Sequence, residues 1–87
     1  MERNDLHLSI FELELCIKHL KHQLSLYTAK SYKSRTHALR MAARIESLTK
    51  LGLLLVRGYR RQLGYDIGFA DAMSNYFDAV LTWVNGR

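Results

Sequence analysis

Residues 48–59 read LTKLGLLLVRGY. Within this stretch the apolar run from Leu51 to Val56 is interrupted only by Gly52. Successive side chains on an α-helix lie about 100° apart, so these residues point in nearly all directions around the axis. We expect this turn to be surrounded by other helices rather than half exposed. Gly52 costs about 1 kcal/mol of helix propensity relative to alanine, and that cost is most easily offset where another backbone approaches closely.

A helical repeat extends from this stretch in both directions. Its apolar positions recur at intervals of three and four, which is typical of one face of an α-helix; they are Met41, Ile45, Leu48, Gly52, Leu55 and Tyr59. We predict a helix over residues 34–63. Its end is indicated by Arg60 and Arg61, which suit the C-terminal helix dipole, and by Gly64, which suits a left-handed C′ position.

An earlier helix is predicted over residues 5–29, with Asp5 as its N-cap. The same spacing of three and four recurs there, in the positions Leu6, Ile10, Leu13, Ile17, Leu20, Leu24 and Tyr27. Residues 28–36 lose this pattern and gather hydroxyl side chains, which favour caps and turns. We place a turn there; because no glycine marks it, a continuous helix through this region is the alternative.

A third helix is predicted over residues 67–84, with Asp66 as its N-cap. Its apolar face is wide and consists of Phe69, Met73, Tyr76, Phe77, Val80, Leu81, Trp83 and Val84. Such a face is suited to the groove between the first two helices. The expected fold is therefore all-α: residues 1–87 form a single helical domain, a long antiparallel helical hairpin with a third packed helix in a three-helix bundle.

The first helix has a second apolar face on the side opposite its predicted core positions. This face consists of Leu8, Phe11, Leu15 and Leu26. One partner helix cannot cover both faces, so either a third helix of the same chain or another copy of the protein takes the second one. We interpret these four residues as a candidate protein interface, and a homodimer is one form that the interface can take.

The formal net charge of +5 is unevenly distributed. Residues 18–61 carry eleven Lys or Arg and one acidic residue, Glu46. The predicted basic surface consists of Lys30, Lys33, Arg35, Arg40, Arg44, Lys50, Arg57 and Arg61. A soluble helix carries charged residues on its exposed face in any case, but this asymmetry favours an anionic partner, either a nucleic acid or an acidic protein surface.

The residue types that carry catalysis or bind metals do not form a recognisable site. Cys16, His19 and His22 have suitable chemistry for Zn²⁺, but steps of three residues sweep these side chains around about 120° of the helix surface. Ser9, Glu12 and Glu14 could be combined into a catalytic triad on paper. Ser9 serves more simply as a cap, and the two glutamates as part of a solvated helix face. We expect no enzyme activity, no metal and no cofactor.

The single cysteine excludes an intramolecular disulfide and favours a reducing compartment. The N-terminus has no succession of basic, apolar and small residues, and the longest apolar run is too short to span a bilayer. We expect a cytoplasmic protein without a membrane span.

These observations predict a non-enzymatic protein-interaction module, an adaptor or inhibitor that binds a protein or a nucleoprotein complex. A chain this short suits a phage or plasmid modulator of a host complex, an expectation that comes from size alone. The alternative is a dimeric nucleic-acid-binding regulator that uses the basic surface for phosphate contacts.

Overall fold

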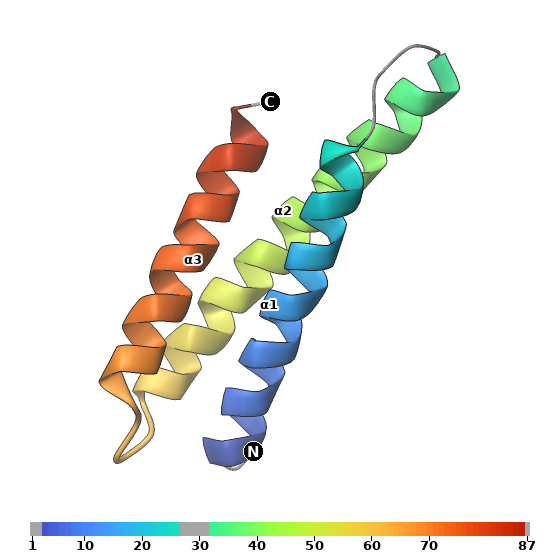
Figure 1. Ribbon diagram of the computed structural model, residues 1–87. Helices are drawn as coiled ribbons and strands as arrows, with labels where there is room; N and C mark the ends of the chain where they lie inside the picture. The colour runs from blue at the N-terminus through green and yellow to red at the C-terminus, as the bar shows by residue number, and fades with distance from the viewer. Residues whose placement is uncertain (1–2, 27–31, 87) are drawn as a thin grey trace.

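The computed structural model describes the backbone of residues 3–26 and 32–86 and the side chains of residues 5–26 and 35–86. It contains three helices, α1 (Arg3–Ser25), α2 (Tyr32–Arg60) and α3 (Ile67–Asn85). α1 and α3 run in one direction and α2 runs in the other, so that the ribbon rises, descends and rises again (Figure 1). The predicted all-α three-helix bundle with its antiparallel hairpin is confirmed.

The helix boundaries differ from the predictions by one to four residues at every end except the start of α3. α1 begins at Arg3, so Asp5 lies in the first turn and is not the N-cap. α1 ends at Ser25, followed by a turn in which the amide of Leu26 donates to the carbonyl of Gln23, and residues 27–29 of the predicted helix lie outside the described residues. Because α1 and α2 run in opposite directions, the alternative of one continuous helix is wrong (Figure 1).

The end of α2 also differs from its prediction. α2 ends at Arg60, three residues before the predicted position, and Gly64 follows in the connection rather than at C′. Gly64 does take a left-handed conformation, with φ of 70°. The amide of Asp66 donates to the Tyr59 hydroxyl over 2.9 Å, which ties this connection back to the last turn of α2.

The start of α3 matches its prediction. The Asp66 carboxylate accepts a hydrogen bond of 3.0 Å from the amide of Phe69, so Asp66 is the N-cap. This bond satisfies one of the amide groups that have no carbonyl partner in the first helical turn.

The core forms along the predicted apolar positions of all three helices. In α1, Ile10, Ile17 and Leu24 are fully buried, and in α2 Ile45 is fully buried. The hydroxyl of Thr49 is also buried, and it donates to the carbonyl of Ile45. The most deeply buried positions of α3 are Ala70, Phe77 and Val80.

α2 and α3 pack closely at Gly52. A Cβ placed on this residue would lie 2.7 Å from the Cζ atom of Phe77, closer than real contacts allow. The close approach expected at Gly52 is therefore present, but a buried aromatic ring makes it rather than a backbone.

The third helix packs mainly on α2 and contacts α1 less closely. α2 is the middle helix: it makes close backbone approaches to both α1 and α3, whereas α1 and α3 meet mainly through long side chains. Because α3 leaves part of α1 uncovered, the molecule has an open face along α1.

Candidate functional site

The second apolar face of α1 is exposed. Leu8, Phe11, Leu15 and Leu26 are between 43% and 64% exposed, while Ile10, Ile17 and Leu24 on the opposite side of the same helix are fully buried. α3 does not cover this face, so the alternative in which a third helix of the same chain takes it is wrong. The structure thus exposes all four predicted interface residues: Leu8, Phe11 and Leu15 lie on α1, and Leu26 lies in the turn directly after it. We call these four residues the α1 outer face.

The outward side of α2 also exposes large apolar side chains. Leu51 and Leu54 are 45% and 59% exposed, so the helices of this one chain do not surround residues 51–56 as expected. The reason is that α1 and α3 both pack on one half of α2, at Gly52, Val56 and Tyr59, and leave the other half without a neighbour.

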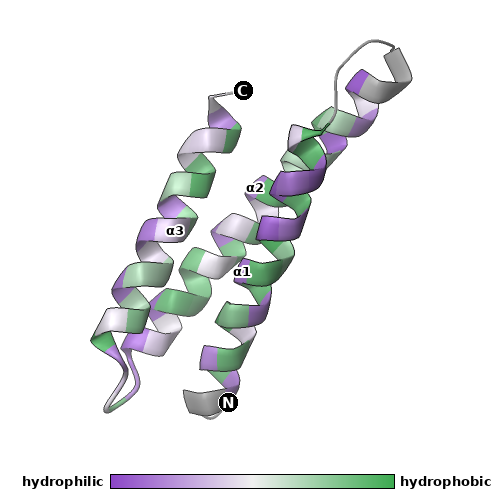
Figure 2. Ribbon diagram, in the orientation of Figure 1, coloured by the Kyte–Doolittle hydropathy of each residue, from purple (hydrophilic) through white to green (hydrophobic). Residues whose placement is uncertain are grey.

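The predicted basic surface divides into two groups along α2. All its members with a described side chain are exposed; they are Arg35, Arg40, Arg44, Lys50, Arg57 and Arg61. Lys30 and the side chain of Lys33 lie outside the described residues. In the described parts of the chain no carboxylate pairs with Arg40, Arg44, Arg57 or Arg61, whereas the Lys50 amine lies 3.1 Å from the Glu46 carboxylate. Hydrophilic residues crowd the end of α1 and the beginning of α2 (Figure 2).

One of these groups borders a hollow between α1 and α2, of about 460 Å³. Its lining consists of Leu20 from α1 and His37, Arg40, Met41 and Arg44 from α2. Leu20 and Met41 are half-buried, and the two arginines are exposed. The hollow therefore combines an apolar floor with a strongly basic rim.

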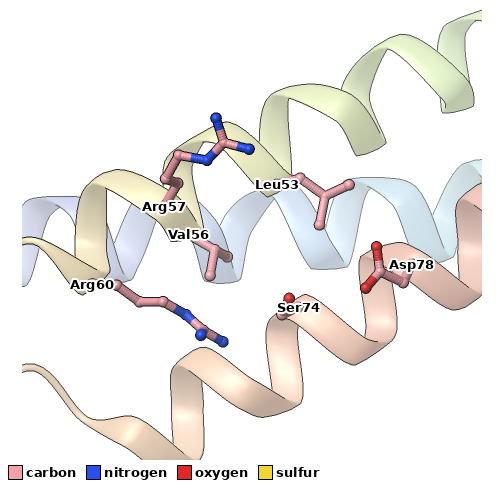
Figure 3. A pocket seen from close by; sticks show the side chains of 6 residues that line it. All are labelled: Leu53, Val56, Arg57, Arg60, Ser74 and Asp78. Carbon is pink, nitrogen blue, oxygen red and sulfur yellow. The ribbon is translucent and has the colours of Figure 1, made fainter.

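A second hollow, of about 320 Å³, lies between α2 and α3 (Figure 3). Leu53 and Val56 supply its apolar part, and its rim carries both signs of charge, including Arg60 and Asp78. The Arg60 guanidinium is also 2.9 Å from the carboxylate of Asp71. Figure 3 shows Arg60 directed towards α3 and Arg57 directed away from it. Because its charges are mixed and partly paired, this hollow has no preference for an anion.

A ladder of polar and aromatic side chains joins α1 to α3. The His7 ring stacks on Phe69 with 3.7 Å between centroids, and the Lys21 amine lies 4.9 Å from the centre of the Trp83 ring. Between these two rungs the Lys18 amine lies 5.4 Å from the centre of the Tyr76 ring. Amines above aromatic faces are attracted by the ring quadrupole.

The middle rung contains a buried carboxylate. Glu14 is buried, which corrects its assignment to a solvated helix face, and its carboxylate lies 3.5 Å from the Lys18 amine. Burial raises the pKa of the Tyr76 phenol above its ordinary value, and the negative charge of Glu14 raises this pKa further. The Tyr76 hydroxyl is buried without a hydrogen-bond partner among the described residues.

Sequence reasoning missed this ladder, although its signal is present. His7, Glu14 and Lys21 are seven residues apart, and so are Phe69, Tyr76 and Trp83. Two helices that run in the same direction bring such positions into register, rung by rung. The sequence places these aromatic residues on the apolar face of the third helix, but the spacing within one helix does not indicate their partners on α1.

The residues considered for metal binding do not assemble. Cys16 is exposed, and within residues 3–26 and 32–86 no three His, Cys, Asp or Glu side chains lie close enough together to hold a metal ion.

Among the described helices none is long and apolar enough to cross a membrane. Comparisons of the chain with models of known protein families, with curated proteins and with solved structures found no match.

Proposed function

We propose that this chain is a non-enzymatic protein-interaction module, an adaptor or inhibitor that docks the α1 outer face on a partner protein. The observation that carries the proposal is the exposure of Leu8, Phe11, Leu15 and Leu26, whereas Ile10, Ile17 and Leu24 on the opposite side of α1 are fully buried. Large apolar side chains exposed on one side of a small protein are typical of a binding surface.

The α1 outer face has the form that helix-mediated recognition uses. Its members follow one another at intervals of three, four and eleven residues, so they form a stripe along the helix rather than scattered contacts. Phe11 is the aromatic member, and aromatic anchors surrounded by aliphatic contacts dominate the binding free energy of many protein interfaces. A rigid helix that presents such a stripe loses little conformational entropy on binding.

Site-specific photocrosslinking tests this proposal. A photoreactive phenylalanine analogue is placed at Phe11, and at the exposed Asn75 of α3 as a control, and the full chain is irradiated in nuclease-treated host lysate. We expect a discrete protein adduct from position 11 and none from position 75. The same adduct should disappear when Leu8 and Leu15 are both replaced by serine.

The outcomes separate the alternatives for this surface. An adduct only with a second copy of the chain would make the α1 outer face a homodimer interface, and sedimentation at micromolar concentration would then give a dimeric mass. Absence of any adduct at position 11, in a variant whose circular dichroism is unchanged, would contradict the proposal. The serine variants should stay folded because exposed substitutions usually change stability by about 0.5 kcal/mol or less.

Nucleic-acid binding is the second candidate function, and a specific observation favours it. Arg40, Arg44, Arg57 and Arg61 are exposed and, among the described residues, have no carboxylate partner. If a nucleic acid is the ligand, replacing Lys30, Lys33 and Arg35 by alanine should weaken binding strongly and flatten its salt dependence. Unchanged binding to duplex DNA in this triple variant would contradict the role of these three residues, and no binding by the parent chain at low salt would eliminate this candidate.

A further inference from the structure

We infer that the hollow between α1 and α2 binds an acidic helical segment of a partner protein. An apolar side chain of the segment rests on Leu20 and Met41, and two of its carboxylates pair with Arg40 and Arg44. The inference rests on the proposed function in that the occupant is a protein, but it assigns the contact to a different surface from the α1 outer face.

The arginine pair determines the chemistry of the occupant. Arg40 and Arg44 are one helical turn apart, so their side chains start about 5–6 Å from each other on the same face of α2. Both are exposed, and within the described chain neither has a carboxylate partner. A guanidinium binds a carboxylate through two parallel hydrogen bonds. Carboxylates one turn apart on a partner helix match this spacing.

The floor of the hollow determines what lies between those carboxylates. Leu20 and Met41 are half-buried and leave apolar surface open to a volume of about 460 Å³. This volume is within the range of pockets that hold compact ligands, and it accommodates a leucine-sized or phenylalanine-sized side chain. An apolar side chain on this floor removes surface from water, which a bare anion does not do.

The rest of α2 argues for a protein rather than a nucleic acid at this site. About 20 Å of helix separates Arg44 from Arg57, whereas each strand of a DNA duplex presents a phosphate about every 3.4 Å along the duplex axis. On the outward side of α2, within that interval, Leu51 and Leu54 are exposed and Lys50 is already paired with Glu46. The basic track is therefore interrupted where a phosphate chain would need it to continue.

An NMR titration of the full nitrogen-15-labelled chain tests this inference. The probe is a capped, alanine-based helical peptide with two glutamates one turn apart and a leucine between them, and the control probe has glutamine in place of both glutamates. We expect the glutamate peptide to shift the amide signals of Leu20 and of residues 37–44, and the glutamine peptide to leave them unchanged.

A matched pair of variants distinguishes the hollow from general charge attraction. The double replacement Arg40→Ala and Arg44→Ala should weaken the peptide at least about tenfold, because charge-assisted hydrogen bonds are lost. Arg57→Ala with Arg61→Ala removes the same charge from the far end of α2 and should weaken it less than about twofold, as expected for distant, screened charges. Circular dichroism confirms that both variants are folded.

Several outcomes would overturn the inference. The first is an equal loss of peptide affinity in the two double variants. The second is that the amide signals do not shift, or that the shifted signals lie outside the hollow. The third is a short DNA duplex that shifts the same amide signals at a lower concentration than the peptide. The result is separable from that of the proposed function: crosslinking at Phe11 can fail while the peptide binds the hollow, and the reverse can also occur.

Discussion

α3 contacts its two neighbours in different ways. Against α2 it packs with fully buried apolar groups, and the Phe77 ring lies directly against Gly52, where a methyl group has no room. Against α1 it makes contacts through long and partly exposed side chains, such as Lys21 on Trp83. Close packing excludes water and loses free energy when any atom is removed, whereas a side-chain ladder tolerates change. This difference predicts that the α3 interface with α2 contributes more to the free energy of unfolding than the α3 interface with α1.

The largest expected effect compares two phenylalanines of α3. Phe77→Ala should lower the free energy of unfolding by about 3–5 kcal/mol, because it removes a fully buried ring and leaves a cavity. Phe69→Ala should lower it by about 1–2 kcal/mol, because this ring is half-buried and stacks on His7. Urea unfolding followed by circular dichroism measures both values.

If Phe77→Ala leaves too little folded protein to measure, Phe77→Leu gives a smaller loss at the same position. Equal losses at Phe77 and Phe69 would contradict the comparison, because they would mean that the two interfaces of α3 contribute alike.

A smaller effect with opposite signs is expected at two glycines of α2. Gly52→Ala should lower the free energy of unfolding by about 1–2 kcal/mol, since the strain of displacing Phe77 exceeds the gain of about 1 kcal/mol in helix propensity. Gly58→Ala should raise it by about 0.5–1 kcal/mol, because the nearest atom, in Leu6, lies at an ordinary contact distance of 3.8 Å. Thermal unfolding of both variants against the parent chain checks these signs.

A stabilised Gly52→Ala variant would show that the Phe77 ring shifts without cost, and it would remove the main support for the tight α2 and α3 packing. A destabilised Gly58→Ala variant would instead indicate a constraint on α2 that its neighbours in this chain do not explain.

The sequence predicts which helices form better than it predicts how they are arranged. Residue spacing identified three helices, the Asp66 cap and most of the core, because periodicity reports which side of a helix is apolar. It does not report how many neighbours a helix has. The apolar run therefore predicts that Leu51 and Leu54 are surrounded, yet both are exposed because α1 and α3 share one half of α2.

The candidate site divides in the same way. The exposed stripe of Leu8, Phe11, Leu15 and Leu26 follows from helical spacing within α1 alone. The hollow between α1 and α2 depends on how two helices meet, and its arginines were identified only as part of a wider basic surface. The ladder depends on the register of α1 against α3, which becomes visible only when both sets of seven-residue steps are compared.

The smallest expected effect is a pH dependence at the middle rung of the ladder. The pKa of Tyr76 is raised in the folded protein, by burial first and by the charge of Glu14 second. An unfolded tyrosine loses its proton near pH 10, so above that pH the unfolded chain binds fewer protons than the folded one, and stability falls as pH rises towards the folded pKa. Tyr76→Phe has no such proton and should lose less stability over this window.

Urea unfolding at intervals of pH from neutral to above pH 10 measures this difference. At neutral pH Tyr76→Phe should be equal to or slightly more stable than the parent chain, since the buried hydroxyl has no hydrogen-bond partner among the described residues. The advantage of Tyr76→Phe should grow above pH 10 and shrink when Glu14→Gln is introduced into both chains, because the glutamine removes the charge that contributes to the shift. If the free energy of unfolding changes with pH in the same way for the two chains, the Tyr76 hydroxyl is open to water. The α3 interface with α1 would then contribute even less to stability, relative to the interface with α2, than its contacts indicate.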